Sequence, residues 1–103
     1  SYQLQQNALL PLAARTIVLN FGHNAGKQLF ARIGKPSGQG EDHKIIKTLC
    51  CIKTLMGWHT EKASRICRER TGGAGYLAQN VIGDCLTGSH SACTAEGDNK
   101  VLM

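Results

Sequence analysis

The sequence predicts an all-α fold, an incomplete antiparallel helical bundle that lacks at least one wall. In two long segments, apolar residues recur at steps of three and four, which is the period of a helix with one buried stripe. A linker rich in glycine and proline separates these segments, and a glycine-rich turn ends the second one. With 103 residues, the chain is long enough for one domain but small for a core that stabilises itself.

The first helix is expected over residues 2–32. Its apolar stripe would contain Leu4, Ala8, Leu9, Leu12, Ala13, Ile17, Leu19 and Phe21. Pro11 lies inside this pattern, and because proline has no backbone N–H, we expect it to kink the helix or to mark a helix start. Residues 33–40, "IGKPSGQG", then form a linker that should turn the chain back on itself.

A second helix is expected over residues 41–70. It should begin near Glu41 or Asp42, whose charges suit the positive end of the helix dipole, and end near the basic Arg70. Its apolar stripe would contain Ile45, Leu49, Ile52, Leu55, Met56, Ala63, Ile66 and Cys67. The glycine-rich turn over residues 71–76, "TGGAGY", should end this helix.

Shorter elements are expected after this turn. A short third helix would cover residues 77–86, and residues 87–98, which are rich in Gly, Ser and Thr, are predicted to form a loop. A last helix would start at residue 99 and continue to residue 103. Residues 1–103 would thus form a single, partial domain.

Composition and charge argue against several classes of function. The 12 basic residues exceed the 7 acidic ones and give a net charge of +5. They are scattered and are not interleaved with aromatic residues, which argues against nucleic-acid binding. No apolar run is long enough to predict a membrane span. The four histidines and five cysteines show no metal-ligand spacing and no C-x-x-C pair, so no metal site is predicted and the cysteines are expected to be free thiols.

Two glycine-containing motifs carry the most specific signal in the sequence. They are "RERTGGAGY" and, further along the chain, "CTAEGDNKVLM". As a pair they resemble the acyl-CoA oxidase branch of the acyl-CoA dehydrogenase superfamily, whose carboxy-terminal helical domain carries a G-G-x-G-Y turn and then a T-x-E-G-[DE]-N segment. The stretch "QLQQNALLPLAARTIVLNFG" also resembles this family's Q-x-x-L-x-P-x-x-A helix, so the resemblance covers most of the chain.

The resemblance implies a catalytic role for Glu96. In the family, the glutamate of T-x-E-G is the base that removes the α-proton of an acyl-CoA, while the β-hydrogen leaves as a hydride to the flavin. The small Ala95 and Gly97 would let the backbone approach the thioester closely, and the Glu96 N–H would help to hold the thioester oxygen. The residues themselves leave a second interpretation open, in which Glu96 is an ordinary carboxylate at a helix start.

The same resemblance implies that both motifs contact FAD, through Gly72, Gly73, Gly75, Tyr76, Gly97, Asp98 and Asn99. The glycines of the first motif would let the main chain come close to the cofactor, in part across a subunit interface. The second motif would contact FAD near the start of the last helix, where free N–H groups favour phosphate. Asp98 has an alternative role, because a phosphate would repel its carboxylate and the side chain would instead cap the helix.

By resemblance, the chain is a fragment of a longer flavin-dependent acyl-CoA oxidase. Such an enzyme converts acyl-CoA to trans-2-enoyl-CoA in fatty acid β-oxidation and passes electrons to FAD and then to O2. Its partners would be the acyl-CoA substrate, the remaining domains of the parent chain, and a second copy in a homodimer or larger assembly. The expected compartment is the peroxisome, with the mitochondrion or another organelle as the alternative. We expect these 103 residues alone to be inactive.

Two other functions remain open at this point. The parent protein could be an acyl-CoA dehydrogenase that hands electrons to an electron-transfer flavoprotein, although the spelling "TAEGDNKVLM" favours the oxidase branch. The chain could also be a non-catalytic helical scaffold, derived from an oxidase, in a larger assembly. A flavin absorption band in the native protein would separate the two enzymes from the scaffold.

Overall fold

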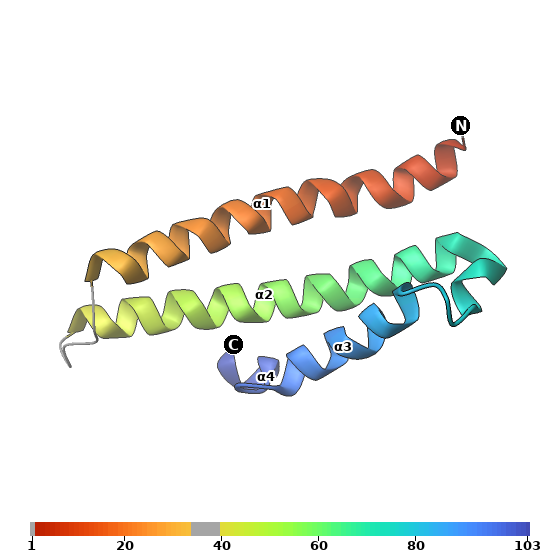
Figure 1. The fold of residues 1–103 in the computed structure, drawn as a ribbon. Coiled ribbons are helices and arrows are strands. Elements are labelled where there is room, and N and C mark those ends of the chain that lie inside the picture. The colour runs from red at the N-terminus through yellow and green to blue at the C-terminus, as the bar shows by residue number, and fades with distance from the viewer. Residues whose placement is uncertain (1, 34–39) are drawn as a thin grey trace.

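The computed structural model describes residues 2–33 and 40–103, and most of these residues are helical (Figure 1). In chain order, the elements are α1 (Gln3–Ile33), α2 (Gly40–Thr71), the 3-10 helix η1 (Gly72–Tyr76), α3 (Ile82–Thr94) and α4 (Asn99–Leu102). No strand occurs in the described residues, and the all-α prediction is confirmed. Of the linker expected over residues 33–40, residues 34–39 lie outside the described part of the chain.

Helix α2 lies in the middle of the molecule. Helix α1 runs antiparallel along one side of it, and α3 folds back along the other side (Figure 1). The short elements η1 and α4 also pack on α2. The molecule is elongated, with principal extents of 53 × 26 × 22 Å. Every other described element therefore depends on α2 for its packing.

Helix α1 continues through Pro11 from Gln3 to Ile33, so this proline does not mark a helix start. Contacts near both ends of α1 hold it against α2. Near the start of α1, the Gln5 side chain donates a hydrogen bond to the Arg70 carbonyl oxygen (2.9 Å). Near its end, Gly26 packs so closely that an added Cβ would lie 2.6 Å from Ile52 Cδ1.

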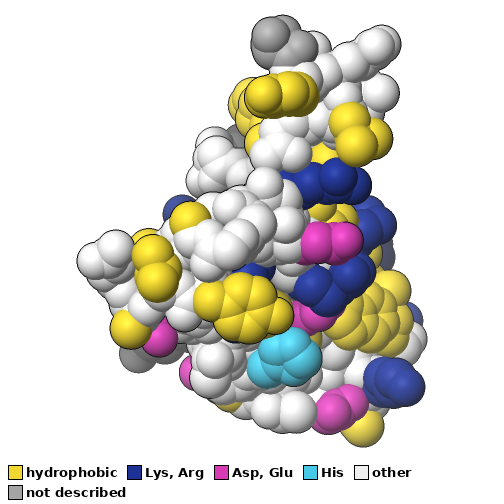
Figure 2. Space-filling model, turned by 90° about the vertical axis from the view of Figure 1, so that its right-hand side faces the viewer, with side chains coloured by type: hydrophobic (Ala, Val, Ile, Leu, Met, Phe, Trp, Pro, Cys, Tyr) yellow, Lys and Arg dark blue, Asp and Glu magenta, His cyan; other side chains and the backbone are white. Residues whose placement is uncertain are grey.

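Few apolar side chains are buried, because α1 packs against α2 along only one of its faces. Among the described residues, only Leu12 and Ile45 count as buried hydrophobic side chains. Much of the stripe expected on α1 is exposed instead, including Leu4, Ile17 and Phe21. Figure 2 likewise shows apolar side chains on the surface beside lysine and arginine side chains. The apolar face of α1 is thus left largely uncovered within these residues, whereas most of the stripe expected on α2 is buried or half-buried.

Helix α3 corrects the expected order of short elements after the glycine-rich turn. A helix over residues 77–86 and a loop over residues 87–98 were expected, but the helix covers Ile82–Thr94. The Ser and Thr hydroxyls that suggested a loop donate to carbonyl oxygens one turn back, as Thr87 does to Gly83 (3.2 Å) and as Ser89, Ser91 and Thr94 also do. Before this helix, the Asn80 side-chain oxygen accepts from the Ile82 N–H (3.2 Å).

Within the described residues, no helix is both long enough and apolar enough to cross a membrane.

When these 103 residues are produced alone, we expect a helical but loosely packed state. The reason is that the exposed apolar face of α1 would meet water, and long helices need tertiary packing for most of their stability. Circular dichroism should show a helical far-UV signal, a weak near-UV signal and a broad thermal transition. A sharp, concentration-independent transition of a monomer would contradict this expectation.

Candidate active site

The connection between α3 and α4 is a tight reversal that carries Glu96. The backbone is extended at Ala95, turns through φ values of 57° at Glu96 and 108° at Gly97, and is extended again at Asp98. Glu96 is the one non-glycine residue with positive φ among residues 2–33 and 40–103. Such a backbone costs about 1–3 kcal/mol and persists only where surrounding contacts hold it. The turn therefore needs support from outside itself.

Gly97 is required by the same reversal. Any other residue at this position would have an unfavourable backbone φ, and its Cβ would lie 3.1 Å from Leu102 Cδ1. Because Leu102 belongs to α4, the turn and the short helix pack directly on each other.

The Glu96 carboxylate is exposed and has no hydrogen bond or ion pair within the described part of the chain. It borders an open hollow of about 330 Å³ whose other lining residues are Lys53, Met56, Gly57, Thr60, Ala92 and Ala95. The cap of α4 is Asp98, whose Oδ1 accepts from the Lys100 N–H (2.8 Å). Asp98 is therefore the acidic residue that caps the start of α4. The Glu96 carboxylate makes no such contact within the described residues and remains available to a ligand.

Asn99 anchors the reversal to α2. It is 2% exposed, and its side-chain oxygen accepts from Lys53 Nζ (2.7 Å) while its amide nitrogen donates to the Thr54 carbonyl oxygen (3.4 Å). Lys53 Nζ also donates to the Gly97 carbonyl oxygen. Gly57 leaves room for the amide, since an added Cβ would lie 2.9 Å from Asn99 Nδ2. The predicted contact between Asn99 and the cofactor stays a prediction.

Lys53 and Gly57 were not predicted as site residues. The scattered basic residues were expected on solvated helix faces, and Lys53 has no sequence feature that separates it from the others. Gly57 lies four residues after Lys53, so both residues lie on the same face of α2. Only the fold brings this face to the Glu96 reversal.

The second group of predicted site residues forms η1 at the end of α2. Gly72 has a φ of 67°, and an added Cβ at Gly72 or Gly73 would meet open space, so the main chain is accessible there. Gly75 is buried, and a Cβ on it would lie 2.9 Å from the Arg68 carbonyl oxygen. Tyr76 is 82% exposed, and the Arg68 guanidinium lies 4.9 Å from the centre of its ring.

An open hollow of about 340 Å³ adjoins this turn and is lined by Arg65, Arg68, Glu69, Gly72, Tyr76 and Leu86. Guanidinium groups and an accessible glycine main chain are suitable partners for phosphate oxygens. The residues present therefore fit the phosphate-bearing part of FAD, while Glu69 contributes one opposing charge.

The structure does not bring the two groups of predicted site residues together. They lie at opposite ends of α3 (Figure 1). This helix has 13 residues, which corresponds to a length of about 20 Å. Any ligand that contacts both groups in one copy of the chain must therefore extend along α3.

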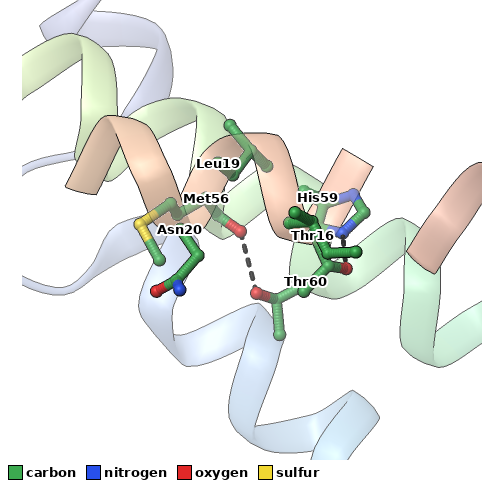
Figure 3. A pocket seen from close by; sticks show the side chains of 7 residues that line it. Thr16, Leu19, Asn20, Met56, His59 and Thr60 are labelled. Carbon is green, nitrogen blue, oxygen red and sulfur yellow. Dashed lines mark hydrogen bonds between the residues drawn. The ribbon is translucent and has the colours of Figure 1, made fainter. Parts of the chain in front are cut away.

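A further hollow of about 260 Å³ lies between α1 and α2 (Figure 3) and is lined by Thr16, Ile17, Leu19, Asn20, Met56, His59 and Thr60. Met56 and Thr60 also line the hollow beside Glu96, so the two hollows adjoin. His59 Nε2 and Thr16 Oγ1 are 2.7 Å apart. Because the Thr16 hydroxyl also donates to the Leu12 carbonyl oxygen (2.8 Å), Nε2 is the donor in the contact with His59.

His59 is a buried structural histidine, 6% exposed, and its Nδ1 has no hydrogen-bond partner among the described residues. Burial lowers the pKa of His59 below its usual value, and the positive charges of Arg15 and Lys62 lower the pKa further. Within residues 2–33 and 40–103, no group of three His, Cys, Asp or Glu side chains could hold a metal ion.

Comparisons with known proteins agree with the two motifs. The family described as "Acyl-CoA oxidase, C-alpha1 domain" matches residues 1–103. Acyl-coenzyme A oxidase 3, peroxisomal, from Arabidopsis thaliana is 32% identical over 103 residues, which cover 99% of this chain and 14% of that protein. Peroxisomal acyl-coenzyme A oxidase 3 from Homo sapiens is 35% identical over 113 residues, which cover 99% of this chain and 16% of that protein.

A third relative, peroxisomal acyl-coenzyme A oxidase 1 from Rattus norvegicus, is 30% identical over 105 residues, again covering 99% of this chain and 16% of that protein. The chain thus spans only a small part of the length of these relatives. No solved structure matches it significantly. Since the family match extends over every residue, the chain belongs to the acyl-CoA oxidase C-alpha1 domain family.

Proposed function

We propose that this chain is the C-alpha1 domain of an FAD-dependent acyl-CoA oxidase, in which Glu96 is the catalytic base. The reaction would convert acyl-CoA to trans-2-enoyl-CoA. The observation that carries the proposal is the Glu96 reversal, a strained turn whose carboxylate borders an open hollow and has no partner among the described residues. Family membership supplies the reaction class, and the geometry supports the role of this carboxylate within it.

In this proposal, Glu96 accepts the proton from the α-carbon of the acyl thioester and becomes a neutral carboxylic acid. FAD, when bound, would supply the acceptor for the β-hydrogen, which leaves as a hydride, and O2 would be the final electron acceptor. The substrate loses one proton and one hydride, which leaves a double bond between the α- and β-carbons. No competing ion pair within the described residues has to break before the carboxylate accepts the proton.

The Glu96 backbone supports the same role. No hydrogen bond of its N–H is found within the described residues, although the neighbouring Ala95 N–H donates to the Ser91 carbonyl oxygen (2.8 Å). A free N–H beside the base can donate to the thioester oxygen, where negative charge develops as the α-proton leaves. The left-handed turn would thus present both a proton acceptor and an oxyanion donor to one substrate.

For FAD, we propose contacts at the accessible main chain of Gly72 and Gly73. Gly75 supports this turn from inside, and Tyr76 offers an exposed ring. The adjacent arginine side chains could pair with phosphate oxygens. Gly97 would contribute its backbone near the flavin.

The roles of Asp98 and Asn99 toward FAD are proposed as indirect. Asp98 caps α4 and Asn99 is buried, so both would hold the shape of the reversal that meets the cofactor.

A homodimer or larger assembly would explain the separation of the two groups across α3. We propose that the Gly72–Tyr76 turn contacts the cofactor of a second copy, while Glu96 serves the active site of its own copy. The exposed apolar residues of α1 and α2 would then be covered by the remaining domains of the oxidase or by this second copy. Because the relatives are named as peroxisomal proteins, we assign the oxidase to the peroxisome.

Replacing Glu96 with glutamine in the full oxidase tests the catalytic role. Glu96→Gln keeps the shape of the side chain but removes the proton acceptor, so flavin reduction by acyl-CoA should slow by about two to four orders of magnitude. Stopped-flow measurement of flavin bleaching gives this rate, while the FAD content and the affinity for acyl-CoA should change little.

The matched control is Asp98→Asn, which changes the neighbouring carboxylate to an amide that also caps helices. This variant should reduce its flavin at nearly the normal rate. Normal flavin reduction in Glu96→Gln would remove Glu96 from the mechanism, and an equal loss in Asp98→Asn would show that the rate follows local charge and not the base.

The contact between α1 and α2 at His59 should make the oxidase sensitive to acid. Since burial lowers the pKa of His59 in the folded state, the unfolded chain binds more protons near and below pH 6.5. The contribution of the neutral histidine to stability is complete above the unfolded pKa and declines as the pH falls below it. Thermal unfolding between pH 8 and pH 5.5 should therefore show a steeper fall of Tm for the wild type than for His59→Gln.

Thr16→Val is the control for this pH dependence. It removes the hydrogen-bond partner but keeps the buried histidine, so Tm should fall at every pH while the acid sensitivity remains. Parallel Tm curves for the wild type and His59→Gln would contradict the assigned role of His59.

A further inference from the structure

Lys53 is a cation of α2 whose ammonium group, within the described residues, donates hydrogen bonds only to the segment that carries the Glu96 reversal and the start of α4. Its ammonium group donates to the Gly97 carbonyl oxygen and to Asn99 Oδ1, the latter at 2.7 Å. These acceptors lie 44 and 46 residues further along the chain, so the contacts join two distant segments. One acceptor directly follows Glu96, and the other opens α4.

The Lys53 ammonium and the Glu96 carboxylate line the same hollow but do not pair with each other. Within the described residues, no ion pair joins them, and the ammonium contacts a carbonyl and an amide instead. A direct pair would compete with the proton that the proposed base has to accept. The cation is therefore placed where it can hold the main chain and leave the carboxylate free.

The reversal needs such a support because Glu96 has a positive φ. Two groups of α2 complete the anchor around the buried Asn99. The Thr54 carbonyl oxygen accepts from its amide nitrogen, and the missing side chain of Gly57 leaves room for that amide. Lys53 is the member of this set that also bonds to the turn itself, at the Gly97 carbonyl oxygen.

We propose that Lys53 is a positioning residue for the base, which fixes the Glu96–Gly97 reversal through the Gly97 carbonyl oxygen and the Asn99 side chain. The inference rests on the proposed function, because it assumes that Glu96 removes the α-proton. Lys53 acts through these two contacts and needs no contact with substrate or cofactor. Its loss would leave the carboxylate present but poorly aligned with the α-carbon.

The test uses Lys53→Met in the full oxidase, since methionine keeps an unbranched side chain but has no N–H donors. A misplacement of about 1 Å can cost about 100-fold in rate, so we expect flavin reduction by acyl-CoA to slow by about 10- to 100-fold. FAD content and acyl-CoA affinity should stay close to normal. Lys53→Arg, which keeps the charge and the donors, should recover much of the rate.

The matched control is Lys47→Met, on the same helix. Lys47 is exposed, and its ammonium group makes no hydrogen bond or ion pair within the described residues. This variant should therefore reduce its flavin at the normal rate. An equal loss of rate in Lys47→Met would overturn the assignment, because it would follow from the lost charge alone.

The double variant Lys53→Met with Glu96→Gln decides whether Lys53 acts through Glu96. If it does, Lys53→Met should slow the reaction little once the base is gone. A full additional loss in the double variant would overturn the inference. Normal flavin reduction in Glu96→Gln alone would refute the proposed function, whereas a slow Glu96→Gln with a normal Lys53→Met would refute only the role of Lys53.

Gly57→Ala provides a second route if Lys53→Met does not fold. The added methyl group would press on the Asn99 amide from α2 and should slow flavin reduction in the same way. Gly22→Ala is its control, because an added Cβ at this helical position meets nothing within 4 Å and should leave the rate unchanged. Equal rates in these two glycine variants would overturn the inference.

Discussion

The position of Glu96 depends on one set of contacts, those between the α3–α4 connection and one face of α2. The reversal is strained at Glu96, and α4 has only four residues, so neither can hold its shape alone. Lys53 and Thr54 bind the buried Asn99 from α2, and Lys53 also bonds to Gly97. The geometry of the candidate base is thus set by a helix that lies far away from it in the sequence.

These contacts also explain why the neighbouring acidic residues have different roles. A general base needs a carboxylate that is fixed in space but not neutralised by a partner. Asp98 supplies the cap that α4 requires, which leaves the Glu96 carboxylate without a structural task among the described residues. The Lys53 ammonium lines the same hollow, yet it donates its hydrogen bonds to the Gly97 carbonyl oxygen and to the Asn99 side-chain amide.

Helix positions could be predicted from the sequence where apolar periodicity was strong, and the two motifs indicated Glu96 and the Gly72–Tyr76 turn. Prediction failed at α3, because Ser and Thr hydroxyls compete for backbone groups in a loop but satisfy carbonyl oxygens one turn back in this helix. It also failed to identify Lys53, because its partners are distant in sequence and a lysine on a helix is usually solvated. Burial of the α1 stripe was overestimated, since periodicity says which residues share a face but not what covers that face.

The length of α3 links the two halves of the candidate site. The helix continues to Thr94, so the Glu96 reversal lies a full helix length away from the glycine-rich turn. At about 20 Å, one copy cannot place both groups around a single compact part of a ligand. In the proposed assembly, a second copy would relieve this constraint, because it would bring its own Gly72–Tyr76 turn toward the neighbour's cofactor. The apolar residues left exposed on α1 provide the surface that such an assembly, or the other domains of the oxidase, would bury. The spacing within one chain and the uncovered face of α1 therefore favour the same proposal, in which protein outside these residues completes the candidate active site.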